Sequence, residues 1–186
     1  MICCMTSAAP DDQRALLERD LALIAQGSQD ALADLYLRSR SAVYGFSLSL
    51  LKNPSDAEDV LQDTYLQIWR AAGAYRAQGK PMAWVLTITR NLSLSQLRER
   101  QRRDDSLPEH WIDQLADTPA VTQEDRMTLE SLLLHLSEQE RQIVILHALS
   151  GLKHREIAQL LELSLSTVLS KYHRALKKLR ASWKEV

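Results

Sequence analysis

Residues 153–180 carry two apolar runs at helical spacing, with a short break at residues 162–164 between them. The first run consists of Ile157, Leu160 and Leu161, and the second of Val168, Tyr172, Ala175, Leu176 and Leu179. Apolar residues three or four positions apart form one face of a helix. The break at residues 162–164 has the length of the turn in a helix-turn-helix, and Ser164 or Ser166 can cap the second helix. The segment therefore predicts a helix-turn-helix.

The second helix of this pair is basic outside its apolar face. Its basic residues are Lys171, Arg174, Lys177, Lys178 and Arg180. A basic helix that follows a tight turn can enter the major groove of duplex DNA and neutralise phosphates. A plain helical hairpin with a solvated basic face fits the same residues, so this segment alone leaves both interpretations open.

The rest of the chain also favours helices. Leu and Ala dominate, and only five Gly and five Pro occur among 186 residues. Apolar periodicity and break residues predict helices over 13–26, from Ser28 or Asp30 to about 51, over 55–72 and over 82–103. Ser55 and Glu58 have the spacing of a capping box. Further helices are expected to begin at Thr122 or Asp125 and at Ser137. We expect an all-α protein with helical domains at 13–103 and 124–184 and a flexible linker at 104–123.

The charge is strongly segregated although the whole chain carries a net charge of only −1. Residues 73–103 contain seven basic residues against one acidic residue, residues 104–125 contain seven acidic residues and no Lys or Arg, and residues 153–186 contain eight basic residues against three acidic residues. Two basic blocks separated by an acidic block indicate two separate contacts with nucleic acid.

Several classes of function find no support in the sequence. Cys3 and Cys4 are adjacent, which suits neither a disulfide framework nor a zinc site. The five histidines do not form a metal-binding motif, and no glycine-rich phosphate loop occurs. No apolar stretch reaches membrane-spanning length, and the N-terminus lacks a signal-peptide core. We therefore expect a cytoplasmic protein that is not an enzyme and has no metal or cofactor.

Three blocks taken together resemble the extracytoplasmic-function (ECF, group IV) sigma factors of bacterial RNA polymerase, which belong to the sigma-70 family. Residues 56–70 (DAEDVLQDTYLQIWR) are similar to sigma region 2.2, and residues 81–92 (PMAWVLTITRNL) are similar to regions 2.3 and 2.4. Residues 136–141 (LSEQER), with the helix-turn-helix, are similar to region 4. The resemblance covers about residues 20–182 and implies a transcription initiation factor that directs core polymerase to promoters and helps to melt the minus-ten element.

The resemblance assigns roles to residues of region 2. It implies that the helix over residues 55–72 binds the clamp helices of the polymerase β′ subunit through Asp56, Asp59, Gln62, Asp63 and Leu66. Val60, Tyr65, Ile68 and Trp69 of that helix are expected to be buried. It also implies contacts with minus-ten DNA by Tyr75, Arg76, Lys80, Arg90, Asn91 and Arg98. The Tyr75 ring could instead anchor its loop in the core, and Trp84 is expected to pack in the core.

In region 4 the resemblance implies contacts with the minus-thirty-five element. The expected residues are Ser164, Ser166, Thr167, Ser170, Lys171, Arg174, Lys177 and Lys178. The first five lie near the helix start, where base edges are within reach, and the last three are better placed for phosphates. Glu162 stands where the turn commonly has Gly, Leu169 replaces a basic residue, and Lys171 lacks the two-pronged fork of Arg.

The implied partners are core polymerase (the β′ clamp and the β flap), promoter DNA and an anti-sigma factor. The acidic linker could occupy a basic channel of the polymerase as an RNA mimic, or serve as a solubilising tether. Two other interpretations remain: a DNA-binding regulator that dimerises through its N-terminal helices, and a protein-interaction module whose basic face is incidental. The acidic N-terminal helix followed by the Trp-x-x-x-Ile-x-Arg-Asn helix favours the sigma interpretation over both, and an isolated helix-turn-helix regulator needs no second basic surface.

Overall fold

The computed structural model describes residues 10–103 and 135–182, and every regular element in these ranges is a helix. The elements are α1 (Pro10–Ile24), α2 (Gln29–Leu51), α3 (Pro54–Ala71), the short 3-10 helix η1 (Ala72–Ala74), α4 (Pro81–Arg103), α6 (Glu138–Ala148), α7 (His154–Leu161) and α8 (Leu165–Ser182). The all-α prediction is confirmed. The linker expected at 104–123 and the helix expected to begin at Thr122 or Asp125 lie outside the described residues.

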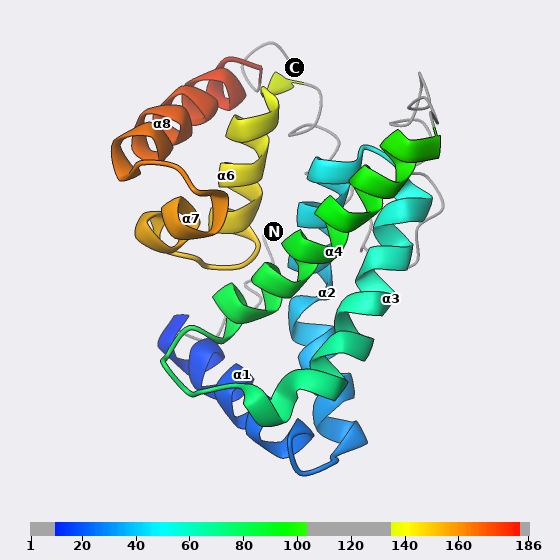
Figure 1. The fold of residues 1–186 in the computed structure, drawn as a ribbon. Coiled ribbons are helices and arrows are strands. Elements are labelled where there is room, and N and C mark those ends of the chain that lie inside the picture. The colour runs from blue at the N-terminus through cyan, green and yellow to red at the C-terminus, as the bar shows by residue number, and fades with distance from the viewer. Residues whose placement is uncertain (1–9, 104–134, 183–186) are drawn as a thin grey trace, which may run out of the picture.

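Helix α2 is the central element of the fold. Figure 1 shows α2, α3 and α4 side by side, with α1 crossing near one end of this group, and α2 contacts all three. Every residue from Ala42 to Ser49 is buried, although two of them are serines. The Ser47 and Ser49 hydroxyls donate hydrogen bonds to carbonyls one turn earlier, at 2.9 and 2.7 Å. A helix that is buried on all sides must be enclosed by other elements, as α2 is.

The starts of the helices follow the capping chemistry of their first residues. The Ser28 hydroxyl caps α2 by accepting a hydrogen bond from the Ala31 N–H at 3.2 Å, as expected. The capping box predicted at Ser55 is wrong, because α3 begins at Pro54 and its cap is Asn53, whose side chain accepts from the Asp56 N–H at 3.1 Å. Proline suits the first position of a helix because that position needs no N–H donor.

Two further helices start at a proline and thus slightly earlier than predicted. Helix α1 begins at Pro10, three residues before the expected start, and α4 begins at Pro81. The apolar periodicity on which the predictions depended starts only after these prolines, so it could not locate the first turns.

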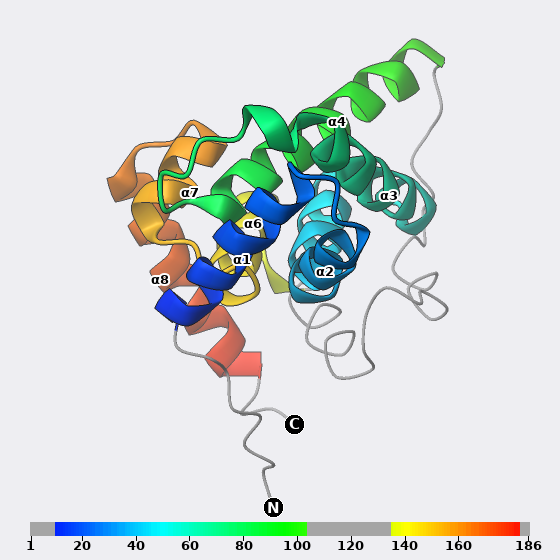
Figure 2. The same ribbon diagram turned by 90° about the horizontal axis from the view of Figure 1, so that it is seen from below.

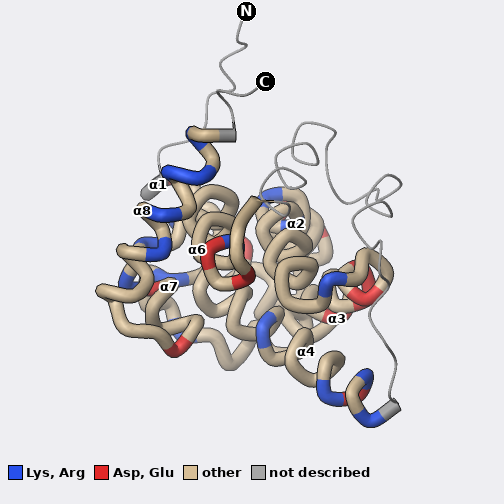
Figure 3. The backbone as a smooth tube through the Cα atoms, turned by 90° about the horizontal axis from the view of Figure 1, so that it is seen from above, with Lys and Arg blue, Asp and Glu red and all other residues tan. Residues whose placement is uncertain are grey.

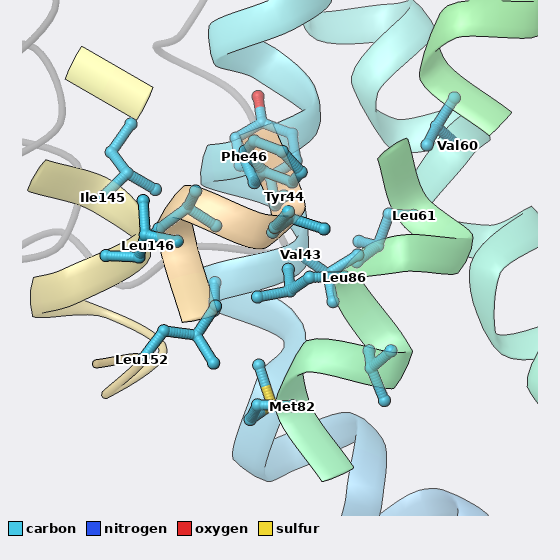
Figure 4. Close-up of a cluster of buried hydrophobic side chains, with 14 of the residues drawn as sticks. Val43, Tyr44, Phe46, Val60, Leu61, Met82, Leu86, Ile145, Leu146 and Leu152 are labelled. Atoms are coloured by element: carbon cyan, nitrogen blue, oxygen red, sulfur yellow. The ribbon is translucent and has the colours of Figure 1, made fainter. Parts of the chain in front are cut away.

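Helix α6 packs the C-terminal part of the chain on the central helix through an apolar surface. Helix α6 contacts α2 on one side and α8 on the other. Ile145 and Leu146 of α6, Leu152, and Tyr44 and Phe46 of α2 are all buried and belong to one hydrophobic cluster, part of which Figure 4 shows. The helices of residues 10–103 and 135–182 therefore share one continuous hydrophobic cluster. An ion pair between Lys52 and Glu138, 2.9 Å apart, lies at the same junction.

An ion pair with a buried carboxylate joins α1 to α2. The Asp20 carboxylate is fully buried and accepts a hydrogen bond from the Arg38 guanidinium at 3.2 Å, while the more exposed Arg19 guanidinium lies 3.3 Å from its other oxygen. A buried carboxylate that loses its cation destabilises a protein more than the intact pair stabilises it.

We therefore expect Arg38→Met to lower the free energy of unfolding by about 2–4 kcal/mol, because Asp20 would remain buried with only Arg19 as partner. Urea unfolding followed by circular dichroism measures this loss. Adding Asp20→Asn to Arg38→Met should recover part of it. Arg70→Met, at an exposed position of α3, is the control and should cost less than about 1 kcal/mol. Equal losses in Arg38→Met and Arg70→Met would contradict the importance of pairing the buried Asp20 carboxylate.

Candidate functional site

Helix α3 presents a continuous stripe of exposed side chains. Its outward positions, spaced three or four residues apart, are Asp59, Gln62, Asp63, Leu66 and Trp69. Two of these side chains are large and apolar, with Leu66 54% exposed and Trp69 37% exposed. The opposite side of α3 is buried against α2 and α4. The structure therefore brings together four of the five residues predicted to bind polymerase and adds a tryptophan to them.

Trp69 was predicted to be buried, and this prediction is wrong. The residue lies three positions after Leu66 and seven after Gln62, which places all three on one side of the helix. That spacing was visible in the sequence, but the size and apolar character of tryptophan favoured a core position instead.

Asp56 does not join this exposed stripe. Its carboxylate lies 2.9 Å from the Arg100 guanidinium of α4, and both side chains are largely buried, with 21% and 16% exposed. The pair connects the start of α3 with the second half of α4. The expectation that Asp56 presents an exposed carboxylate is therefore wrong, because the carboxylate pairs with Arg100 of another helix.

The loop between η1 and α4, residues 75–80, carries three of the predicted DNA contacts. Arg76 and Lys80 are exposed, whereas Tyr75 is half-buried and packs on Trp84 of α4 with the ring centroids 5.0 Å apart. The Tyr75 hydroxyl donates a hydrogen bond to Glu18 of α1 at 2.8 Å. Burial and this hydrogen bond raise the pKa of Tyr75, so its phenol stays protonated. Of the two roles left open for Tyr75, the structure shows the anchoring one.

Helix α4, which follows the 75–80 loop, carries the other residues predicted to contact minus-ten DNA. In Figure 3 the positions of Lys and Arg, in blue, recur along the backbone of α4 and of α8, and acidic positions, in red, lie in α3. Asn91 and Arg98 are exposed, while the Arg90 guanidinium lies 3.2 Å from the Glu162 carboxylate in the turn between α7 and α8. Arg90 therefore bridges α4 and the helix-turn-helix.

A cleft of about 490 Å³ separates the loop from α7. Its walls come from the loop and the start of α4 on one side and from Glu156, Gln159 and Leu160 of α7 on the other. Arg76 and Lys80 of the loop both line it. The helix-turn-helix thus faces the predicted minus-ten surface across this cleft.

The predicted helix-turn-helix is confirmed as α7, a three-residue turn and α8. Ser164 caps α8, since its hydroxyl accepts a hydrogen bond from the Thr167 N–H at 3.1 Å. Glu162 has the left-handed backbone expected of a residue in the place of glycine, with φ of 57°. Its N–H donates to the Ala158 and Gln159 carbonyls and closes α7, which offsets part of the conformational cost.

The start of α8 exposes small hydroxyl side chains and one apolar side chain. Ser166 and Ser170 are exposed, Thr167 is half-exposed, and Leu169 is 37% exposed between them. The Ser170 hydroxyl donates to the Ser166 carbonyl at 2.7 Å, while its oxygen stays able to accept. This end of α8 offers both hydrogen-bonding and apolar contacts.

The basic residues of α8 divide into two groups. Arg174 and Lys177 are exposed, and Lys171 is half-exposed. Lys178 instead donates a hydrogen bond of 2.6 Å to the Glu140 carboxylate, of which only 4% is exposed. Burial alone would raise the pKa of Glu140, but Lys178 and the backbone N–H of Ser137 outweigh it and lower the pKa to about 2. Lys178 therefore holds α8 on α6.

Comparison with known proteins places the chain in one family. The family described as Sigma-70 region 2 matches residues 35–103, and the family described as Sigma-70, region 4 matches residues 126–179. The ECF RNA polymerase sigma factor SigK of Mycobacterium ulcerans (strain Agy99) is 32% identical over 177 residues, which cover 91% of this chain and 92% of that protein. SigK of Mycobacterium sp. (strain KMS) is 30% identical over 165 residues, covering 84% and 85%.

The chain belongs to the ECF sigma factors of the sigma-70 family. It is therefore a transcription initiation factor. Membership in this family favours the sigma interpretation over a dimeric DNA-binding regulator and over a protein-interaction module with an incidental basic face. The co-crystal structure of the sigma factor RpoE in complex with the anti-sigma factor NepR from Bartonella quintana has a TM-score of 0.61 and 26% identity, and the match covers 84% of this chain and 98% of that chain. This likeness supports the same helical fold.

Two further observations concern the described part of this sigma factor. Within residues 10–103 and 135–182, no group of three or more His, Cys, Asp or Glu side chains is arranged to hold a metal ion. Among the helices in these same ranges, none combines the length and the apolar character that crossing a bilayer requires.

Three aromatic rings pack together where α6, α7 and α8 meet. The rings of His147 and His154 stack with centroids 4.6 Å apart, and Tyr172 contacts both edge-on. The Nε2 atom of His154 is buried without a hydrogen-bond partner among the described residues. Burial lowers the pKa of His154, and the nearby His147 and His173 lower it further.

We expect the sigma factor to lose stability as the pH falls from 7.5 to 5.5. The unfolded chain takes up a proton at His154 near pH 6.5, whereas the folded protein takes it up only at lower pH, so stability falls through this window. The pair of Glu140 with Lys178 persists there, because the Glu140 pKa is about 2. The thermal midpoint of wild type should drop by about 2–4 °C more than that of His154→Phe, which keeps a stacked ring.

Differential scanning calorimetry at the two pH values measures this difference, and His135→Gln at an exposed position serves as the control. An equal drop in wild type and in His154→Phe would show that other groups cause the pH dependence.

Proposed function

We propose that this ECF sigma factor binds core RNA polymerase through the exposed stripe of α3, helps to open the minus-ten element with the 75–80 loop and α4, and contacts the minus-thirty-five element with α8. The observation that carries the proposal is the stripe of α3. Leu66 and Trp69 expose large apolar surfaces there beside the polar Asp59, Gln62 and Asp63. Exposed apolar side chains surrounded by polar ones mark protein interfaces, and tryptophan often dominates their energetics.

The proposed minus-ten surface combines cations, an amide and a shaped loop. Arg76, Lys80 and Arg98 are exposed and can neutralise phosphates, and Asn91 offers an amide for base edges. The cleft beside the loop has room for groups of the non-template strand. Because Tyr75 is packed and hydrogen-bonded, we assign it to the shape of the loop.

The proposed minus-thirty-five surface is the first half of α8. Ser166, Thr167 and Ser170 can hydrogen-bond base edges, and the exposed Leu169 can contact the methyl group of thymine. Arg174 and Lys177 lie one and two turns further along, where phosphates are within reach. Lys178 is less available for DNA, since it pairs with the buried Glu140.

We further propose that an anti-sigma factor regulates this chain. The structural relative RpoE was solved in complex with the anti-sigma factor NepR, which supports the same kind of control here. The contact of the Arg90 guanidinium with Glu162 holds the two proposed DNA surfaces close together on either side of the cleft, where one partner can cover both. RNA synthesis itself is the work of the polymerase, so we place the sigma factor with it in the cytoplasm and assign it no catalytic step.

Transcription in vitro with core polymerase and fragmented genomic DNA tests the proposal. We expect RNA 5′ ends that appear only with this protein, and at least about tenfold fewer with the double variant Gln62→Ala and Asp63→Ala, because two exposed contacts of the α3 stripe are lost.

The matched control is Gln29→Ala with Asp30→Ala, which makes the same chemical change on exposed positions of α2. Its transcription should stay within about twofold of wild type. An absence of protein-dependent start sites, with a second sigma factor active under the same conditions, would overturn the proposed function. Equal activity of the two double variants would overturn the role of the α3 stripe.

A further inference from the structure

One carboxylate oxygen of α1 holds both ends of the 75–80 loop. The Oε1 atom of Glu18 accepts a hydrogen bond from the Tyr75 hydroxyl at 2.8 Å and another from the Gly79 N–H at 3.0 Å. These donors lie 57 and 61 residues away in the sequence. In Figures 1 and 2 the loop between η1 and α4 passes beside α1, so the contact joins two elements that are adjacent in space.

The loop needs such a brace because its own backbone does little to fix it. Residues 76–79 form no regular element and are exposed, and Gly79 has a left-handed backbone with φ of 68°. Glycine has the greatest freedom in the unfolded chain, so holding it in one conformation costs the most entropy. A charge-assisted hydrogen bond to its N–H offsets that cost more than a neutral one would.

Glu18 is itself held firmly in place. Its neighbours Leu17 and Leu21 are buried in the core, and Asp20 pairs with Arg38 of α2. The second oxygen of Glu18, Oε2, is buried and has no partner among the described residues. Leaving a carboxylate oxygen buried and unpartnered is costly for stability, and such groups are found where another requirement outweighs that cost.

We propose that Glu18 is a positioning residue for promoter melting: it fixes the 75–80 loop in the shape that receives minus-ten DNA. This inference rests on the proposed function of the loop. A loop that is already ordered loses less conformational entropy when the opened strand binds, so the bound state is favoured. Arg76 and Lys80 would carry the DNA contacts, and Glu18 would act only through the loop.

The same contact fixes the chemistry of the Tyr75 hydroxyl. Its proton is donated to Glu18, so towards DNA the oxygen can only accept a hydrogen bond. The Tyr75 ring is held on its other side by Trp84 of α4. Tyr75 therefore fixes the position of the loop relative to α1.

The test compares Glu18→Ala, Glu18→Gln and wild type in complex with core polymerase on a promoter identified by transcription. Permanganate reactivity of the minus-ten thymines measures strand opening. Glu18→Ala removes the shared acceptor and should open the promoter about tenfold less, whereas Glu18→Gln keeps an acceptor oxygen and should stay within about threefold of wild type. Asp12→Ala, at an exposed position of the same helix, is the control and should match wild type.

Three further readouts separate positioning from a general loss of structure. Assembly of the Glu18→Ala protein with core polymerase should equal that of wild type, and a promoter with a pre-opened minus-ten region should restore most of its activity. Hydrogen exchange in residues 75–80 should be faster in Glu18→Ala. In the Tyr75→Phe background, which lacks one of the two donors but keeps the ring, the effect of Glu18→Ala should be smaller than in wild type.

The outcomes are distinguishable. If wild type opens its promoter and Glu18→Ala opens it equally well, or if the two exchange hydrogen in the loop at the same rate, the role of Glu18 is overturned and the proposed function stands. If Glu18→Gln fails as badly as Glu18→Ala while its assembly is intact, the shared-acceptor mechanism is overturned. If wild type with polymerase opens no promoter at all, the proposed function falls and this inference with it.

Discussion

The fold depends on the complete burial of the middle of α2. From Ala42 to Ser49 no side of this helix is exposed, so neighbours must cover it in every direction. Helices α1, α3 and α4 cover it on several sides and α6 covers the remainder. The two largest fully buried side chains among the described residues, Tyr44 and Phe46, both come from this stretch. The surfaces that remain for partners are therefore the outer faces of the covering helices.

This arrangement explains how the three proposed binding surfaces, one for polymerase and two for promoter DNA, can coexist on a small chain. Helix α3 uses one face to cover α2 and exposes the other, which carries Leu66 and Trp69. Helix α4 does the same with its basic side, and α6 holds α8 through the pair of Glu140 with Lys178. Each proposed surface thus lies on the side of a helix opposite to its packing surface, so a change in the core would also move the proposed surface.

Local chemistry was sufficient to predict much of the fold. The two helices and the turn of residues 153–180 were predictable because helical spacing, a three-residue break and a hydroxyl cap all agreed there. The cap of α3 was not, since Asn53 and Ser55 are both good caps and only the position of Pro54 decides between them. The exposed side of Trp69 escaped prediction because the residue type favours the core.

Long-range contacts are the part that no local pattern could reveal. The pair of Asp56 with Arg100 and the contact of Glu18 with Tyr75 join residues more than forty positions apart. Spacing rules describe a single helix, so they place Asp56 correctly on α3 but cannot show which neighbour neutralises it. For the same reason, spacing rules could not predict that α6 packs on α2.

The internal ion pairs reduce what several basic residues can contribute to the free energy of DNA binding. Arg90, Arg100 and Lys178 each have a carboxylate partner within the molecule. Counterions leave DNA in proportion to the phosphates that a protein newly neutralises, and a cation that must first give up its own carboxylate gains little from the exchange. The ionic-strength dependence of promoter binding therefore reports the positive charge that folding leaves free, which is smaller than the number of Lys and Arg residues in the two basic blocks.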